Sequence, residues 1–119
     1  MLKPLVILAA ACLFSSGALA HAHLKAANPA AGARVAASPA ALSLTFSEAL
    51  EAKLSGVTLK GPDGQTIATG APMLDADDKR AMRVPLKGTL PAGKYTVQWR
   101  ALSKDGHSTH GSYDFTVAP

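Results

Sequence analysis

Cysteine occurs only once in the 119 residues, at Cys12, and this scarcity excludes several classes of protein. One cysteine cannot form an intrachain disulfide, so no covalent crosslink of that kind stabilises the fold. The chain also lacks a Cys-x-x-Cys pair, which thiol redox sites and many zinc sites require. A domain built from this chain must therefore rest on an ordinary apolar core.

Runs of charge of one sign are also missing. The 12 Lys and Arg residues exceed the eight Asp and Glu residues by four, but they are spread along the chain. Because no basic run is present, we expect no nucleic-acid partner. The turn Gly61-Pro62-Asp63-Gly64 lacks the helix and lysine of a phosphate-binding loop, and Ser103 and Ser108 lie in no nucleophile elbow. We predict no catalytic residues, and therefore a protein that is not an enzyme.

The apolar run at the start of the chain is short. Lys3 precedes the uncharged stretch 5–14, and Ala18-Leu19-Ala20 forms a small-x-small cleavage sequence. This combination is typical of a secretory signal peptide. A membrane-spanning helix needs roughly 20 apolar residues, so an anchor is the weaker interpretation. We predict cleavage after Ala20, giving a signal peptide at 1–20 and one exported domain at 21–119.

Alternation of apolar and polar residues dominates that domain, which is the pattern of half-buried β-strands. The apolar positions are Leu42, Leu44 and Phe46; Tyr95, Val97 and Trp99; and Tyr113, Phe115 and Val117. Further strands are predicted at 57–60, 66–68 and 82–86, with a single helical turn within 49–54. Turn residues separate these short strands, and their spacing predicts an all-β sandwich or Greek-key barrel.

His21 is the residue with the most distinctive position. Cleavage after Ala20 would make it the N-terminal residue, so its α-amine and its own Nδ1 could close a chelate ring on one metal ion. The α-amine has a reference pKa of about 7.7–8.0 and can lose its proton to a metal at neutral pH. Two nitrogens from one residue suit the tetragonal geometry of Cu(II). The alternative interpretation is a terminal histidine with no role.

A second candidate cluster is Asp105-Gly106-His107, just before the last predicted strand. In an extended backbone its carboxylate and imidazole point the same way and would add one oxygen and one nitrogen to the His21 pair. The alternative is an ordinary turn followed by a surface histidine. His23 and His110 compete for a metal role, because His23 would be terminal after a cut at Ala22 and His110 lies near His107. We expect both to be solvated rather than ligating.

Taken in order, several stretches of the domain resemble one known family, the CopC family of periplasmic copper-binding proteins. The stretches that carry the resemblance are His21-Ala22-His23-Leu24, Asn28-Pro29-Ala30-Ala31-Gly32, Leu42-Ser43-Leu44-Thr45-Phe46-Ser47-Glu48, Gly93-Lys94-Tyr95-Thr96-Val97-Gln98-Trp99-Arg100, Ser103-Lys104-Asp105-Gly106-His107 and Gly111-Ser112-Tyr113-Asp114-Phe115-Thr116-Val117. The resemblance covers essentially all of the predicted exported domain. Its combination of motifs is specific, although no single motif is.

The resemblance implies a seven-stranded Greek-key sandwich of cupredoxin or immunoglobulin type. It also implies one Cu(II) ion per chain, held by His21, Asp105 and His107, with Glu48 close to the site without binding the metal. Some family members hold Cu(I) in a methionine-rich loop. Beyond the predicted signal peptide this chain has only Met73 and Met82, so we expect no Cu(I) site.

The function implied by the resemblance is copper homeostasis or resistance in the periplasm. We expect a monomer that buffers copper or passes it to a CopD-type inner-membrane copper protein. A copper-dependent oxidative enzyme of the histidine-brace type is the alternative, but such a brace uses a second histidine where Asp105 would bind here. A third hypothesis is a structural sandwich with incidental histidines. Weak copper binding would favour that third hypothesis.

Overall fold

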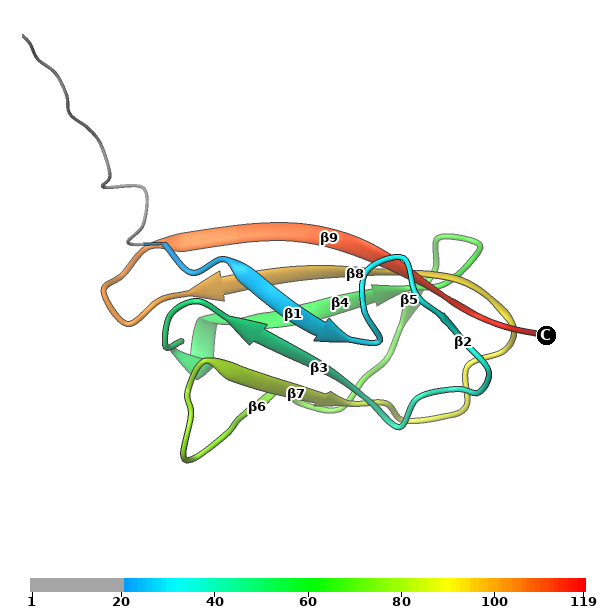
Figure 1. The fold of residues 1–119 in the computed structure, drawn as a ribbon, viewed down its shortest axis with the longest axis horizontal. Helices are drawn as coiled ribbons and strands as arrows, with labels where there is room; N and C mark the ends of the chain where they lie inside the picture. The colour runs from blue at the N-terminus through cyan, green and yellow to red at the C-terminus, as the bar shows by residue number, and fades with distance from the viewer. Residues whose placement is uncertain (1–20) are drawn as a thin grey trace, which may run out of the picture.

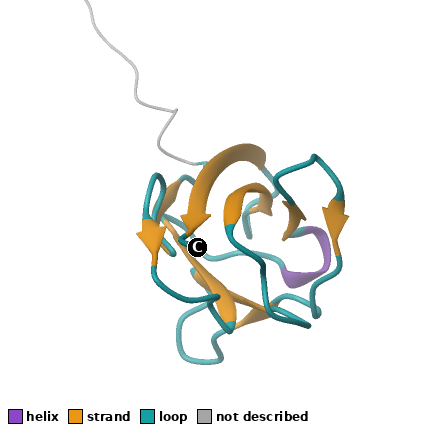
Figure 2. Ribbon diagram, turned by 90° about the vertical axis from the view of Figure 1, so that its right-hand side faces the viewer, coloured by secondary structure: helices purple, strands orange, loops and turns teal. Residues whose placement is uncertain are grey.

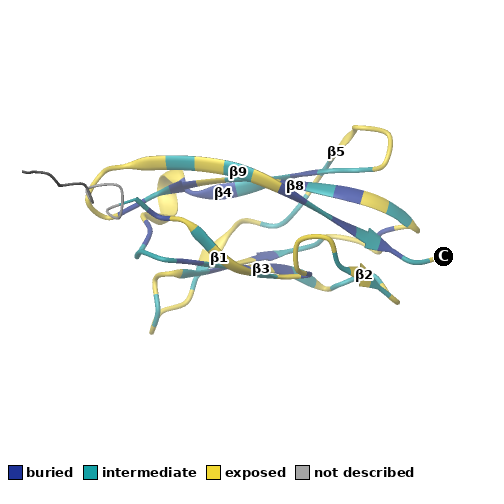
Figure 3. Ribbon diagram, turned by 45° about the horizontal axis from the view of Figure 1, so that its top comes forward, coloured by how far each residue is buried: buried dark blue, intermediate teal, exposed yellow. Residues whose placement is uncertain are grey.

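Two β-sheets make up residues 21–119, the part of the chain that the computed structural model describes. The signal peptide predicted at 1–20 lies outside the described residues. The four-stranded sheet has the order β1-β3-β7-β6, with bounds Leu24–Asn28, Ala41–Phe46, Ala81–Pro85 and Met73–Leu74. The five-stranded sheet has the order β2-β9-β8-β4-β5, with bounds Arg34–Val35, Ser108–Val117, Gly93–Leu102, Gly56–Lys60 and Thr66–Ile67. Figure 3 shows the sheets as two layers, so the predicted all-β sandwich is confirmed.

The described residues form nine strands rather than the expected seven. β2 and β6 are each two residues long and lie at the outer edges of their sheets, where β2 pairs in parallel with β9 and β6 pairs with β7. Pairs this short produce no alternating pattern, so the sequence does not predict them. The helical turn predicted within 49–54 is a 3-10 helix at Ala52–Leu54 (Figure 2). No helix within residues 21–119 is long and apolar enough to cross a bilayer.

The core lies between the sheets and consists of the residues that alternate inward. Leu42, Leu44 and Phe46 of β3 are fully buried, and Met82 and Val84 of β7 continue the same layer. From the other sheet, the buried residues include Leu59, Tyr95, Val97, Tyr113, Phe115 and Val117. Burial of each large apolar side chain stabilises the fold by roughly 1.5–3 kcal/mol, so these two layers can stabilise the sandwich without a disulfide.

Trp99 is the exception among the predicted core residues, because it is only half-buried. Its ring packs edge-on against Phe46, with ring centroids 5.3 Å apart, and lies over Gly111 of β9. A Cβ at position 111 would approach the indole to 2.6 Å, so glycine is required for this close approach. The indole thus packs on the core with one part of its surface and lines a groove between β1 and β9 with the other.

The longest element is the β8–β9 hairpin, which is paired without interruption from Gly93↔Val117 to Leu102↔Ser108. Its turn, residues 103–107, lies at the end of the sandwich where the described chain begins (Figure 1). The hairpin thereby brings the predicted Asp105 and His107 pair to the same end of the molecule as His21.

Candidate metal centre

The turn that carries Asp105 and His107 is organised by the buried hydroxyl of Ser103. The Ser103 N–H donates to the His107 carbonyl oxygen at 3.0 Å, and the Gly106 N–H donates to the Ser103 carbonyl oxygen at 2.9 Å. Gly106 has a φ of 93°, a conformation that glycine adopts without steric cost. These backbone bonds close the turn tightly and hold Asp105 and His107 on the same side of it.

The Ser103 hydroxyl donates to Oδ1 of Asp105 and accepts from the His107 N–H at 3.2 Å. The same Asp105 oxygen lies 3.3 Å from Nδ1 of His107. The hydrogen bond from Ser103, with a smaller contribution from His107, lowers the pKa of Asp105 below its ordinary value. The Asp105 carboxyl group is therefore an anionic carboxylate throughout the neutral pH range.

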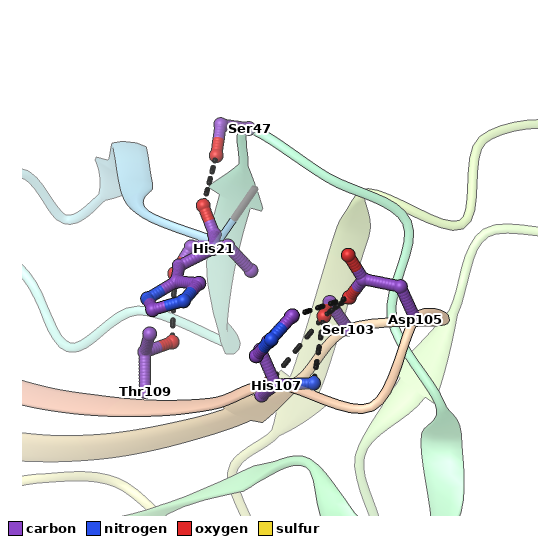
Figure 4. A network of polar contacts seen from close by, with 7 residues as sticks. His21, Ser47, Ser103, Asp105, His107 and Thr109 are labelled. Atoms are coloured by element: carbon purple, nitrogen blue, oxygen red, sulfur yellow. Dashed lines mark hydrogen bonds and ion pairs between the residues drawn. The ribbon is translucent and has the colours of Figure 1, made fainter. Parts of the chain in front are cut away.

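His21 lies directly beside this turn. Its imidazole ring centroid is 4.6 Å from that of His107, with an angle of 32° between the planes. Figure 4 shows the two rings together, with Asp105 on the far side of His107. The side chains of His107 and Asp105 are about half exposed, at 50% and 47%, so both are accessible from solvent. The structure therefore brings the three predicted ligand residues together at one end of the sandwich.

Their nitrogen and oxygen atoms do not yet converge on one point. Within residues 21–119, no three His, Cys, Asp or Glu side chains form a ready-made metal cluster. Nδ1 of His107 faces Asp105 instead of a shared ligand position. In the uncut sequence the His21 nitrogen also belongs to a peptide bond with Ala20, so the proposed chelating amine does not exist before cleavage.

The remaining candidates have different surroundings. Glu48 is half-buried and follows Ser47 in the chain, and no hydrogen bond or ion pair is recorded for its side chain within the described residues. His23 and His110 are exposed and line the groove of about 660 Å³ between β1 and β9, together with Trp99 and Tyr113. The structure therefore separates the environment of His23 and His110 from the cluster of His21, Asp105 and His107.

Sequence reasoning missed three hydroxyl groups that hold the candidate ligands. Ser103 orders the turn, whereas Ser47 and Thr109 bond the backbone around His21: the Ser47 hydroxyl donates to the His21 carbonyl oxygen at 3.3 Å, and the Thr109 hydroxyl donates to the Ala22 carbonyl oxygen at 2.7 Å. Each residue lies within or just after a motif that the sequence displays. Serine and threonine are so common in strands and turns that the sequence alone gave no signal for these contacts.

The fold and the site together define a class of protein: a small two-sheet sandwich with two imidazoles and a carboxylate gathered at one end. The chain belongs to the CopC domain family, whose sequence model matches residues 24–118. Protein YobA of Escherichia coli strain K12 is 44% identical over 98 residues, a match covering 82% of this chain and 79% of that protein.

Two solved structures are similar to this fold. CopC from Methylosinus trichosporium OB3b has a TM-score of 0.78 at 34% identity, covering 83% of this chain and 95% of that one. PcoC, described as a methionine-rich copper resistance protein from Escherichia coli, has a TM-score of 0.72 at 39% identity, covering 82% and 98%. These similarities confirm the family predicted from the sequence motifs. They also agree with the prediction of a copper-binding protein that is not an enzyme.

Proposed function

We propose that this chain is an exported copper-binding protein that holds one Cu(II) ion at the end of the sandwich where His21 and His107 meet. The observation that carries the proposal is the 4.6 Å distance between these two rings, with Asp105 3.3 Å from His107. The related PcoC is a copper resistance protein, which supports the choice of metal. Buffering copper, or passing it to a membrane partner of the CopD type, is the corresponding role.

The donor set suits Cu(II). After cleavage the terminal amine and Nδ1 of His21, the imidazole of His107 and the carboxylate of Asp105 provide three nitrogens and one oxygen. Cu(II) prefers tetragonal nitrogen and oxygen sites and binds more tightly than Zn(II) to a given set of such ligands. The lowered pKa of Asp105 means that copper need not displace a proton from this carboxyl group at neutral pH.

Only local rearrangement is needed to complete the site. The His107 ring must turn so that one of its nitrogens faces the position where copper would bind together with His21 and Asp105. The His107 side chain is half exposed, which leaves room for this rotation. The backbone of the turn is already fixed by Ser103. Because the apolar core and this turn need no ligand for their contacts, we expect the apo protein to fold, in contrast to small domains that fold only on binding a metal.

A Cu(I) site is not part of the proposal. Met82 is 2% exposed inside the core, whereas Met73 is 52% exposed on the short edge strand β6. Cu(I) prefers several clustered thioether or thiolate ligands, whereas residues 21–119 contain only these two methionines, one of them buried in the core, and no cysteine. This chain differs in that respect from the methionine-rich PcoC. We expect a protein specific for Cu(II), without the redox cycle that a histidine-brace enzyme needs.

Metal titration of the mature protein, beginning at His21, tests the proposal. One equivalent of Cu(II) should bind in competition with a chelator, and Zn(II) should bind far more weakly. The EPR spectrum should be tetragonal with nitrogen coupling. His107→Phe and Asp105→Ala should each weaken binding while the apo protein remains folded. Absence of stoichiometric Cu(II) binding by the wild-type protein would contradict the proposed function.

A further inference from the structure

The segment His21-Ala22-His23 is held in place by hydrogen bonds from both sheets. Ser47, which directly follows β3, accepts a hydrogen bond from the His23 N–H at 2.8 Å and donates to the His21 carbonyl oxygen at 3.3 Å. The Ser47 N–H also donates to the His23 carbonyl oxygen at 2.8 Å. From β9 in the other sheet, the Thr109 hydroxyl donates to the Ala22 carbonyl oxygen at 2.7 Å. The carbonyl groups of three consecutive residues are thus all bonded to the body of the sandwich.

The side chain of Ala22 supplies the apolar part of this attachment. Ala22 is 0% exposed and belongs to the core cluster, although its neighbours His21 and His23 are half-buried and exposed. Because the Ala22 side chain is buried in the core, the adjacent side chains of His21 and His23 are left toward the surface. The His21 ring is thereby held against His107 rather than left on a loose chain end (Figure 4).

These contacts are present while residue 20 still precedes His21 in the chain. Neither hydroxyl bonds to the His21 nitrogen, so removal of residue 20 does not itself remove a partner from any of these hydrogen bonds. A terminus that is already ordered loses little conformational freedom when it closes a chelate ring. Groups that hold ligands in orientation without touching the metal commonly change metal affinity by about 10–100-fold.

We propose that Ser47 and Thr109 are positioning residues, which clamp the backbone at His21 and His23 and preset the terminal chelate for copper before the metal arrives. This inference rests on the proposed Cu(II) site at His21. It assigns no metal contact to either hydroxyl. Both act through the backbone and through the buried Ala22.

The first test uses the apo protein and needs no metal. In the mature chain, the amide hydrogen of His23 should exchange slowly with solvent, because it is bonded to the Ser47 hydroxyl. Ser47→Ala should make this amide exchange faster while the amides in the middle of β8 and β9 keep their protection. Ser43→Ala, at an exposed position on the adjacent strand β3, is the matched control and should change nothing.

The second test measures Cu(II) affinity against a competing chelator. Ser47→Ala and Thr109→Val should each lower affinity by roughly 10–100-fold and alter the EPR parameters. Ser47→Thr and Thr109→Ser keep a hydroxyl at each position and should restore much of the affinity, which a loss of general stability would not explain. Thr116→Val, on β9 but with no side-chain hydrogen bond recorded within the described residues, should bind like the wild type.

The two tests separate this inference from the proposed function. If the wild-type protein binds Cu(II) tightly and both variants bind it equally well with the same EPR spectrum, the clamp plays no part in positioning and the inference is wrong. If the wild-type protein binds no copper while its His23 amide is protected, the terminus is ordered but the copper site is wrong. Fast exchange at His23 in the wild-type apo protein would contradict the clamp directly.

Discussion

The imidazole of His21, which precedes β1, lies against the imidazole of His107, which precedes β9, with ring centroids 4.6 Å apart. One residue is at the start of the described chain and the other is in the last hairpin turn (Figure 4). Their contact depends on both sheets, because the segment around His21 bonds to Ser47 after β3 and to Thr109 in β9. The candidate site is therefore a product of the folded sandwich.

Ser103→Ala should weaken Cu(II) binding, although Ser103 is not a predicted ligand, because its hydroxyl orients Asp105 and the backbone of His107. The variant removes the hydrogen bond that most lowers the pKa of Asp105, so this pKa should rise toward 3.8. Loss of the buried hydroxyl should also cost about 1 kcal/mol of stability. Carboxyl chemical shifts followed by NMR during an acid titration measure the pKa. Ser112→Ala, at an exposed position of β9, is the control, and an unchanged Asp105 pKa in Ser103→Ala would contradict the assignment.

The same pKa shift predicts the direction of an acid effect on the apo protein. Because the folded-state pKa of Asp105 is lowered, its stabilising contribution is present above the unfolded value near 3.8 and is lost as the pH falls through the folded value. The stability of Ser103→Ala should therefore depend less on pH below about pH 4 than that of the wild type. Chemical denaturation at a series of acidic pH values measures this slope.

Much of the fold could be predicted from the sequence, because period-2 alternation depends directly on which face of a strand is buried. Leu42, Leu44 and Phe46 display it and are all fully buried. The two-residue strands β2 and β6 could not be predicted, since edge pairing of two residues depends on tertiary position. Trp99 was expected in the core, but it is only half-buried, packing on the core through Phe46 and covering Gly111.

The candidate site was predictable to a similar degree. The Asp105-Gly106-His107 motif, and the position of His21 directly after a cleavage sequence, predicted that these residues form one candidate site. The Ser47, Ser103 and Thr109 hydroxyls could not be identified, because only the register of β3 and the β8–β9 turn brings them to the ligand backbone. The metal roles of His21, Asp105 and His107, and the nearby role of Glu48, stay predictions.

Tyr113, which lines the groove between β1 and β9, should make the stability of the protein depend on pH in the alkaline range. Its hydroxyl is the only buried side-chain polar atom within residues 21–119 without a hydrogen-bond partner, and burial raises its pKa to about 12. Since the folded-state pKa is raised, the contribution of the neutral phenol is fully present below about pH 10 and is lost as the pH rises toward 12. Denaturation at alkaline pH should show this loss.

Tyr113→Phe should reduce this alkaline loss and leave stability near pH 7 unchanged or slightly higher, because it removes a buried hydroxyl that has no partner. Tyr95→Phe is the matched comparison, since the Tyr95 hydroxyl donates to the Pro91 carbonyl oxygen at 2.6 Å. That variant should be destabilised by about 1 kcal/mol through loss of the bond. A destabilised Tyr113→Phe would show that this hydroxyl has a partner in solution.

Export should produce a chain that begins at His21. The predicted cleavage follows Ala20, and a cut there leaves Ala22 as the buried anchor of the new terminus. Mass spectrometry of the protein recovered from the periplasm measures the cleavage position. A chain that begins at His23 would lose Ala22 and its bond to Thr109, and the proposed chelate would have to be reassigned.

The most direct test of the copper site is a comparison of two variants of the mature protein under one competing chelator at one pH. The first adds a single residue before His21, which keeps every side chain but converts the terminal amine into an amide, a poor copper ligand while it stays protonated. The second is His110→Phe, which removes an imidazole from the groove between β1 and β9. The extended protein should lose most of its Cu(II) affinity and His110→Phe should keep it. Full affinity in the extended protein, together with loss in His110→Phe, would contradict the assignment of copper to His21, Asp105 and His107.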